Sequence, residues 1–150
     1  MNPMITQAPP GGSEAVGEVL ALLRETGLPE EGVAEHFDNF LIARDGPRLT
    51  GCIGMERYGD VALLRSLAVV PDRQRDGLGK MLTARLLEDA QSAGVREVIL
   101  LTTTAKDFFA HHFGFIPTER TQFDDAFSSS PEWHLPHCSA AVCMHIRLGV

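Results

Sequence analysis

The sequence predicts one α/β domain with a mixed sheet, and two observations lead to this prediction. Two strand-like runs on either side of a turn at 45–47 indicate an antiparallel hairpin. Farther along, an apolar run at 61–70, an amphipathic stretch at 78–94 and an apolar run at 95–101 indicate a strand, a helix and a strand. A connection of this length favours parallel pairing through a right-handed crossover. The chain is long enough for one core, so we expect a single domain over residues 1–150.

The first helix is predicted between a Pro and Gly turn at 9–12 and Gly27. A short strand at 4–7 precedes this turn, and Ser13 is suited to the N-cap position. The apolar residues of the helix recur at the spacing of an amphipathic helix: Val16, Val19, Leu20 and Leu23.

A second, weaker helix is predicted at 30–36, before the hairpin strands at 39–44 and 48–58. Beyond residue 102 we expect a short helix at 105–112, a short strand at 115–118, a helix at 123–127 and a last strand at 141–148. Most of the run 61–70 is apolar on both faces, which is typical of a central strand covered on each side.

Composition excludes several classes of protein. Twenty acidic residues against 13 basic ones give a formal charge of −7, which disfavours nucleic acid as a partner because phosphate binding needs a basic field. No apolar stretch approaches the roughly 20 residues of a membrane span, and residues 1–12 lack the pattern of a leader, so we expect a cytoplasmic protein without a membrane partner. The cysteines are too few and odd in number for a disulfide framework: Cys52, Cys138 and Cys143.

The sequence Q-R-D-G-L-G at 74–79 lies between an apolar strand and an amphipathic helix. Glycines there let the backbone approach a ligand, and the N-terminus of the following helix attracts an anion. The loop fits neither the Walker pattern nor the dinucleotide pattern. Its interpretation is a pyrophosphate-binding loop, and the alternative is a turn with a structural role alone.

Together with the preceding L-A-V-V-P-D-R at 67–73, this loop resembles motif A of the GNAT superfamily of acetyl-CoA-dependent N-acetyltransferases. The resemblance implies the GNAT fold, a mixed, twisted sheet with helices on both faces, whose parallel central strands (here 61–70 and 95–101) separate to admit acetyl-CoA. A closer resemblance is to the small arsenic-resistance-associated N-acetyltransferases. It rests on LLRSLAV at 63–69, LLTTTA at 100–105, FFA at 108–110 and CSAAVCM at 138–144.

The resemblance assigns acetyl-CoA as co-substrate and implies residues that bind it. The backbone of Leu67, Ala68 and Val69 would pair with the pantetheine arm, and one of its N–H groups would stabilise the oxyanion. The backbone N–H groups that would hold the pyrophosphate belong to Gln74, Arg75, Asp76, Gly77, Leu78, Gly79 and Lys80. Arg73, Arg75 and Lys80 would add positive charge, and Thr102 stands nearest to the family's asparagine.

The candidate catalytic groups depart from the family pattern. Where many members have a tyrosine that protonates the thiolate, this chain has Phe109 or Ala110. The proton could come from water or from a histidine such as His111 or His112, or none could be needed. Glu56 is a candidate for accepting the proton of the amine, with a solvated strand-end charge as the alternative.

Arg65 and Ser66 interrupt the apolar strand at 61–70. Arg65 is interpreted either as an anchor for an anion of the substrate or as one half of a salt bridge to Glu56 or another acid. Ser66 is a second catalytic candidate, although strand alternation puts it on the opposite face, where bonding to the backbone is the alternative role. Tyr58 and His36 are candidates for lining the acceptor site.

The C-terminal part contains a cluster of potential metal ligands: His134, His137, Cys138, Cys143 and His145. Its spacing matches no standard zinc pattern, so we expect no metal site and expect Cys143 to be buried in the last strand.

These observations predict direct transfer of acetyl from acetyl-CoA to a primary amine of a small, amino-acid-like molecule, with an organoarsenical among the candidates. The absence of cysteine from 61–101 disfavours a covalent acyl-enzyme. The alternatives are a non-catalytic acyl-CoA sensor and a metalloid-binding protein that uses Cys138 and Cys143. A homodimer is an expectation from the family.

Overall fold

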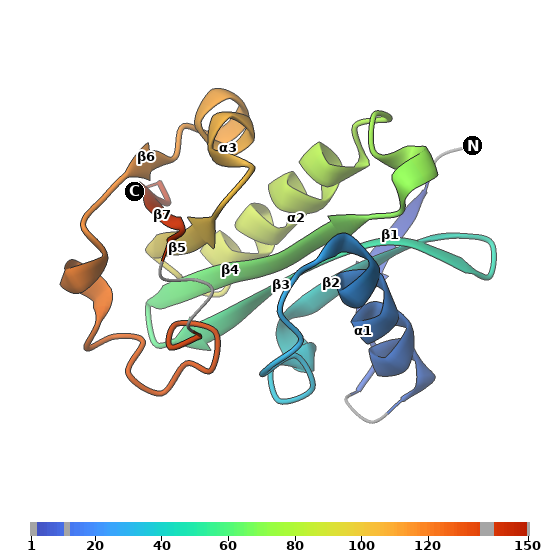
Figure 1. The fold of residues 1–150 in the computed structure, drawn as a ribbon, viewed down its shortest axis with the longest axis horizontal. Coiled ribbons are helices and arrows are strands. Elements are labelled where there is room, and N and C mark those ends of the chain that lie inside the picture. The colour runs from blue at the N-terminus through green and yellow to red at the C-terminus, as the bar shows by residue number, and fades with distance from the viewer. Residues whose placement is uncertain (1–2, 11–12, 136–139, 150) are drawn as a thin grey trace.

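The computed structural model describes residues 3–10, 13–135 and 140–149 of the chain. These residues form a sheet of seven strands in the order β1-β2-β3-β4-β5-β7-β6 (Figure 1). The strands are β1 (Met4–Gln7), β2 (Phe40–Asp45), β3 (Arg48–Tyr58), β4 (Val61–Val69), β5 (Glu97–Thr102), β6 (Ile116–Pro117) and β7 (Val142–Arg147). The β4–β5 pair is parallel and the other pairs are antiparallel, so the predicted mixed sheet is confirmed.

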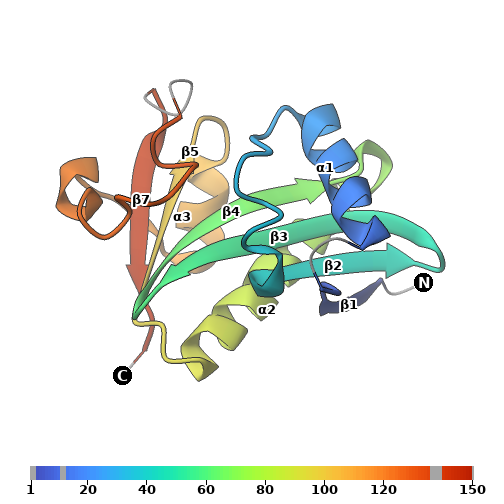
Figure 2. The same ribbon diagram turned by 90° about the horizontal axis from the view of Figure 1, so that it is seen from below.

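Strands β4 and β5 separate along their length. Their parallel pairing runs from Val61 opposite Glu97 to Leu64 opposite Leu100 and ends there. Figure 2 shows the two strands diverging from this paired end. The predicted splaying is therefore confirmed, and within the described part of the chain the residues of β4 beyond Leu64 pair with β3 alone.

Helices cover both faces of the sheet, as predicted (Figure 2). Helix α1 (Glu14–Thr26) packs on one face with a buried cluster that includes Phe37, Phe40 and Cys52. Helices α2 (Leu78–Ser92) and α3 (Lys106–Phe113) contribute to the cluster on the other face. A third cluster, around Trp133 and Phe127, joins the C-terminal loop to β4 and β5.

The bulge in β4 is the local feature that the sequence did not predict. Cys52 of β3 pairs with Ala68, but Gly54 pairs with Arg65, so β4 has one extra residue at this place. Ser66 has a φ of 63° and is the single non-glycine residue with a positive φ in the described part of the chain. Such a bulge breaks strand alternation and turns the adjacent side chains.

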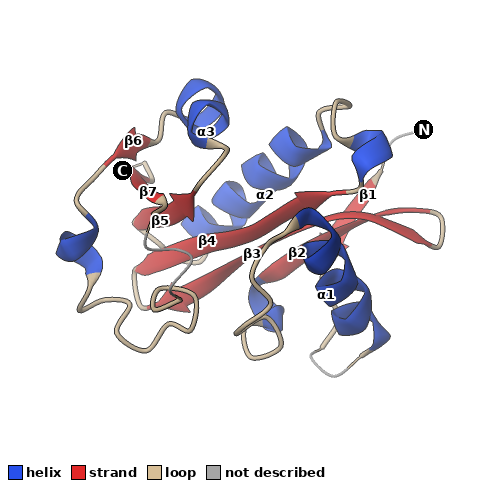
Figure 3. Cartoon of the chain, in the orientation of Figure 1, coloured by secondary structure: helices blue, strands red, loops and turns tan. Residues whose placement is uncertain are grey.

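Two predicted helices are wrong. Residues 30–36 form turns that lead into a 3₁₀ helix at Phe37–Asn39, because Gly32 adopts a φ of 84° that no α-helix accommodates. The segment 123–127 follows a 3₁₀ helix at Arg120–Phe123 and continues as turns. Figure 3 shows the loop that follows this 3₁₀ helix, up to residue 135.

The remaining elements lie where the sequence predicts them. Helix α1 ends at Gly27, whose φ is 76°, and α3 ends at Gly114. Ser13 occupies the N-cap position of α1, although its side chain makes no capping hydrogen bond.

Candidate active site

A cavity of about 170 Å³ lies where β4 and β5 separate. The bulged part of β4 forms one wall and the end of β5 forms another, while α3, the loop after α1 and the C-terminal loop complete it. The lining residues are Gly27, Leu28, Pro29, Leu64, Arg65, Ser66, Leu67, Leu101, Thr102, Thr103, Thr104, Ala105, Phe109, Glu132 and Ala141.

The open edge of β4 provides backbone groups for a ligand. Ala68 and Val69 are buried and pair with β3 on one edge, and the pairing with β5 has ended before them. An extended chain such as a pantetheine arm is suited to add to this free edge, as in strand addition. Leu67 lines the cavity, so the three residues predicted for this role lie in one continuous stretch.

The loop at 74–80 has the geometry of an anion site. Gly77 is the N-cap of α2 with a φ of 82°, and a Cβ at this position would meet nothing within 4 Å. The first bond into the helix runs from the Met81 N–H to the Gly77 carbonyl at 3.1 Å. The preceding N–H groups of Leu78, Gly79 and Lys80 therefore lack acceptors within the helix and point toward its N-terminal end.

Side chains of this loop have mixed roles. The Gln74 side chain donates to the Val69 carbonyl at 3.1 Å and ties the loop to the end of β4. Arg73 is bound to Asp45 at 2.6 Å and so contributes less positive charge than the sequence suggested. Arg75 and Lys80, like Asp76, are exposed. The backbone donors and two exposed cations thus remain for an anion.

Helix α3 presents Phe109 to the cavity. Of the two positions that the sequence left open for the family's tyrosine, Phe109 is buried and lines the cavity, whereas Ala110 is exposed. His111 and His112 are also exposed on α3 and are not among the lining residues. The proton-donating role predicted for His111 stays a prediction. Thr102 lines the cavity, and its Oγ1 accepts a hydrogen bond from the Ala105 N–H at 2.9 Å.

Arg65 is a buried structural hub. Its Nη1 lies 2.7 Å from Glu56 Oε2, its Nε–H donates to Ser66 Oγ at 2.9 Å, and its remaining N–H groups reach the carbonyls of Glu31 at 2.6 Å and Pro29 at 3.1 Å. The salt-bridge interpretation is therefore confirmed. The predicted placement of Ser66 on the opposite face is wrong, because the bulge turns its hydroxyl toward Arg65.

Glu56 lies behind this arginine, with no exposed surface. Tyr58 donates its hydroxyl hydrogen to Glu56 Oε1 at 2.7 Å, and burial together with this bond raises the pKa of Tyr58 to about 12. His36 Nε2 is 3.9 Å from the same oxygen. The alternative of a solvated charge is wrong for Glu56. Glu56, Tyr58 and His36 form one group behind Arg65, and none of them is among the cavity's lining residues.

Glu132 is the site residue that sequence reasoning missed. It comes from the C-terminal loop, it is 6% exposed, and its Oε2 lies 3.1 Å from Arg65 Nε. This oxygen receives no hydrogen bond, since the single Nε–H points to Ser66. Burial raises the pKa of Glu132 to about 7, although Arg65 acts in the opposite direction. The one available signal was Arg65 itself, because a charge in an apolar strand needs partners, and this signal does not single out Glu132.

The predicted cluster of potential metal ligands is described only in part. His137 and Cys138 lie outside the described residues. Cys143 is buried in β7, as predicted, and burial raises the pKa of its thiol to about 11. Among residues 3–10, 13–135 and 140–149, no three His, Cys, Asp or Glu side chains are placed to hold a metal ion. No helix in that part of the chain is long and apolar enough to cross a membrane.

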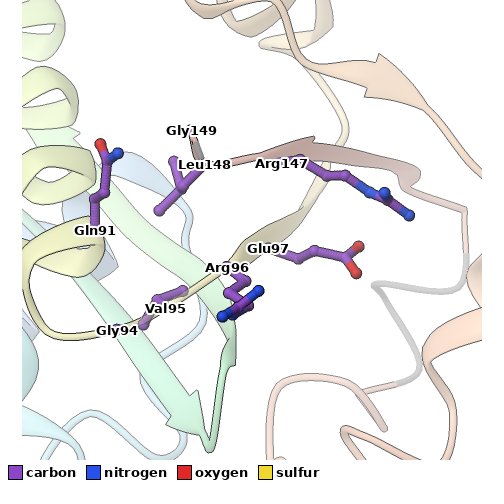
Figure 4. Close-up of a pocket in the computed structure, with 8 residues that line it drawn as sticks. All are labelled: Gln91, Gly94, Val95, Arg96, Glu97, Arg147, Leu148 and Gly149. Carbon is purple, nitrogen blue, oxygen red and sulfur yellow. The ribbon is translucent and has the colours of Figure 1, made fainter.

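A second hollow, about 900 Å³ in volume, lies at the opposite end of β5. Figure 4 shows its lining residues, among them Arg96, Glu97 and Arg147. It is separated from the opened edge of β4 by the length of β5, so we place the candidate active site at the smaller cavity.

The fold and the separation of β4 from β5 agree with a family assignment. The chain matches the model of the acetyltransferase (GNAT) family over residues 12–115 and belongs to that family. This is the class of enzymes that use acetyl-CoA as co-substrate, as the sequence predicted.

Relatives with curated names support the same class. The chain is 27% identical over 112 residues to the amino-acid acetyltransferase of Neisseria meningitidis, an alignment of 71% of this chain and 26% of that protein. The chain thus spans about a quarter of the length of this relative. It is also 29% identical over 108 residues to an uncharacterized N-acetyltransferase of Chlorobaculum tepidum, which covers 71% of this chain and 66% of that one.

Solved structures show the same fold. N-acetylglutamate synthase from Neisseria gonorrhoeae, crystallised with coenzyme A and L-arginine, superposes with a TM-score of 0.80 at 23% identity, over 99% of this chain and 34% of that one. A Mycobacterium tuberculosis protein in complex with CoA gives a TM-score of 0.79 at 21% identity, over 98% and 100% of the two chains.

Proposed function

We propose that this protein transfers the acetyl group of acetyl-CoA directly to a primary amine of a small, amino-acid-like molecule. The observation that carries the proposal is the free edge of β4, which opens onto a cavity containing ionisable side chains. One continuous stretch of β4 therefore offers backbone groups to the thioester and borders the space for the acceptor.

Direct transfer needs a site for the cofactor, donors for the developing oxyanion and a group that accepts the proton of the amine. The backbone of Leu67 to Val69 at the free edge would hold the pantetheine arm and supply an oxyanion donor. The N–H groups of Leu78, Gly79 and Lys80 would hold the pyrophosphate, because those of Gln74 and Asp76 are bonded within the loop. Cys52 is buried among the residues under α1, and its pKa is raised to about 12 by burial, so it is no nucleophile for an acyl-enzyme.

The cavity limits the size of the acceptor. About 170 Å³ is below the roughly 300–1,000 Å³ of pockets that enclose drug-sized molecules, which favours a small acceptor. The relatives named amino-acid acetyltransferase and N-acetylglutamate synthase support an amino-acid-like acceptor. An organoarsenical amino acid remains a candidate through the resemblance given by the sequence.

The test is an acceptor screen that follows the release of CoA thiol. The panel contains the amino acids and their phosphinic and arsinic analogues, and calorimetry measures acetyl-CoA binding in parallel. We expect micromolar or tighter acetyl-CoA binding and thiol release with at least one amine. If acetyl-CoA does not bind, the proposal is refuted.

A second candidate function is an acyl-CoA sensor, and Phe109 favours it because a phenylalanine in the cavity wall cannot protonate a thiolate. Acetyl-CoA binding without thiol release from any amine would support the sensor. Arsenite binding that disappears when Cys138 and Cys143 are replaced would support the metalloid-binding alternative.

We further propose that residues 1–150 act as one cytoplasmic domain and that two chains form a homodimer. Size-exclusion chromatography with light scattering would test the dimer, which would be excluded by a mass of 16.4 kDa in solution.

A further inference from the structure

Glu132 is a buried acid whose Oε2 lies beside Arg65 but receives no hydrogen bond in the described structure. We propose that the carboxylate of Glu132 binds the ammonium group of the acceptor and removes its proton before acetyl transfer. This inference rests on the proposed acetyltransferase function and adds a catalytic residue to it.

The contacts of Glu56 and Glu132 differ, and the difference indicates which carboxylate is placed to bind the acceptor. Both oxygens of Glu56 are occupied, one by the Tyr58 hydroxyl and the other by Arg65, and Glu56 does not line the cavity. Glu132 does line the cavity, and its Oε2 accepts no hydrogen bond although it is buried. A buried acceptor without a donor is costly, and an N–H group of a ligand would satisfy it.

The charges around Glu132 and Arg65 favour a cationic ligand. Arg65 contacts both Glu132 and Glu56, so two carboxylates share this guanidinium. Glu31 adds a further negative field at Glu132. An ammonium group would restore neutrality, whereas a carboxylate of the substrate would meet two like charges. The interpretation of Arg65 as an anion anchor is therefore the less favourable one.

The C-terminal loop holds Glu132 firmly in place. The neighbouring Trp133 is 1% exposed, its backbone N–H donates to Ser130 Oγ at 3.1 Å, and its indole N–H donates to Asp124 at 2.9 Å. The guanidinium of Arg120 lies 4.6 Å from the centre of the indole ring. A base must keep its position relative to the reacting atoms, and these contacts provide that.

The protonation equilibrium of Glu132 suits a base at neutral pH. Burial raises its pKa to about 7, with Glu56 and Glu31 acting in the same direction and Arg65 against them. His36 and Tyr58 approach Glu56 on its other side. A carboxyl group with such a pKa is ionised in a large fraction of molecules at pH 7 and is a stronger base than an ordinary glutamate.

The R–NH₃⁺ group loses one proton to Glu132, which becomes a neutral carboxylic acid, and the free amine forms a C–N bond with the thioester carbon. The C–S bond then breaks, and the electron pair leaves with sulfur. The second proton of nitrogen neutralises the thiolate through water, and Glu132 returns its proton to solvent.

The experiment compares the unchanged protein with Glu132→Gln, Glu132→Asp and a control, Glu88→Gln. Glu88 is an exposed residue of α2 outside the site. Calorimetry measures acetyl-CoA binding by each variant, and kcat/KM is measured from pH 6 to pH 10 with the amine of the panel that the unchanged protein acetylates fastest. We expect Glu132→Gln to bind acetyl-CoA normally and to lose about 10²-fold or more in kcat/KM at pH 7.

The pH profile separates a base from a structural residue. The deficit of Glu132→Gln should shrink as pH rises, because more of the amine is then neutral without help, and Glu132→Asp should keep part of the activity at pH 7. A deficit that is equal at every pH, or full activity of Glu132→Gln, would overturn the role of Glu132 while leaving the proposed function intact. Failure of the unchanged protein to acetylate any amine would instead refute the proposed function, and the inference with it.

Discussion

The unchanged protein should lose unfolding free energy as pH rises, and replacing Glu132 by glutamine should remove this loss. In the folded protein burial raises the pKa of Glu132 from an ordinary value of 4.5 to about 7. The native state therefore keeps a proton that the unfolded chain has already released between these pH values. The stabilisation is fully present below pH 4.5 and is lost as pH rises through about 7.

The size of this effect follows from the pKa difference. One pKa unit corresponds to about 1.4 kcal/mol, so this change corresponds to about 3 kcal/mol of unfolding free energy. Little solvent screening applies, because Glu132 is 6% exposed. Glutamine has nearly the same shape and does not ionise, so the variant should lack this pH-dependent loss.

Urea unfolding of the ligand-free protein measures this change in unfolding free energy directly. The single tryptophan of the chain, Trp133, is buried beside Glu132, so its fluorescence reports unfolding. Unfolding free energies of both proteins at pH 4 and pH 8 give the difference in their pH dependence. The lowered pKa of Asp72, which Arg48 holds at about 2, is common to both proteins and cancels. Parallel curves for the two proteins would refute the argument that Glu132 is protonated in the native state.

Three further pairs of substitutions test the loop at 74–80, the contacts of Arg65 and the packing under α1. Gly77→Glu should weaken acetyl-CoA binding at least about tenfold in calorimetry by placing negative charge beside the pyrophosphate, whereas Gly77→Asn, which tolerates a positive φ, should keep it; equal affinities would exclude the loop as the anion site. Arg65→Met should cost about 3–5 kcal/mol in urea unfolding because it leaves the carboxylate of Glu56 buried without its guanidinium, and adding Glu56→Gln should recover much of this loss; no recovery would show that packing dominates. Gly54→Ala should cost at least about 2 kcal/mol, since its Cβ would lie 2.3 Å from the buried ring of Phe40, while Gly17→Ala in open space should gain about 0.5–1 kcal/mol; a neutral Gly54→Ala would contradict the packing argument.

The features that the sequence predicted are those that depend on neighbouring residues. The loop at 74–80 is one example, because a strand, a glycine turn and a helix start follow each other directly in the chain. The end of α1 at Gly27 is another, since a left-handed residue terminates a helix whatever lies around it.

Three features that depend on contacts between distant segments were missed. The helix predicted at 30–36 is absent because Gly32 must pass close to Pro131 and Arg65, where a Cβ would lie 2.7 Å from the proline ring. Glu132 follows that same proline, and nothing in the local sequence around it indicates a role. The bulge at Ser66 likewise depends on the pairing of β4 with β3. Cys52 of β3, whose thiol contacts the Ser66 carbonyl, lies 14 residues earlier in the chain.

The acidic composition of the chain is compatible with both halves of the proposed reaction. At the end of β4 the proposed anion site would rely on backbone N–H groups and the start of α2, so it would need few cations, and Arg73 is already bound to Asp45. At the bulge of the same strand, the carboxylates of Glu56 and Glu132 outnumber the charge of Arg65 and favour an ammonium group. One strand therefore separates a site for a polyanion from a site for a cation. A polyphosphate without an amine should compete with acetyl-CoA and leave Glu132 unaffected, whereas the acceptor amine should lower the pKa of Glu132, because the ammonium group stabilises its carboxylate.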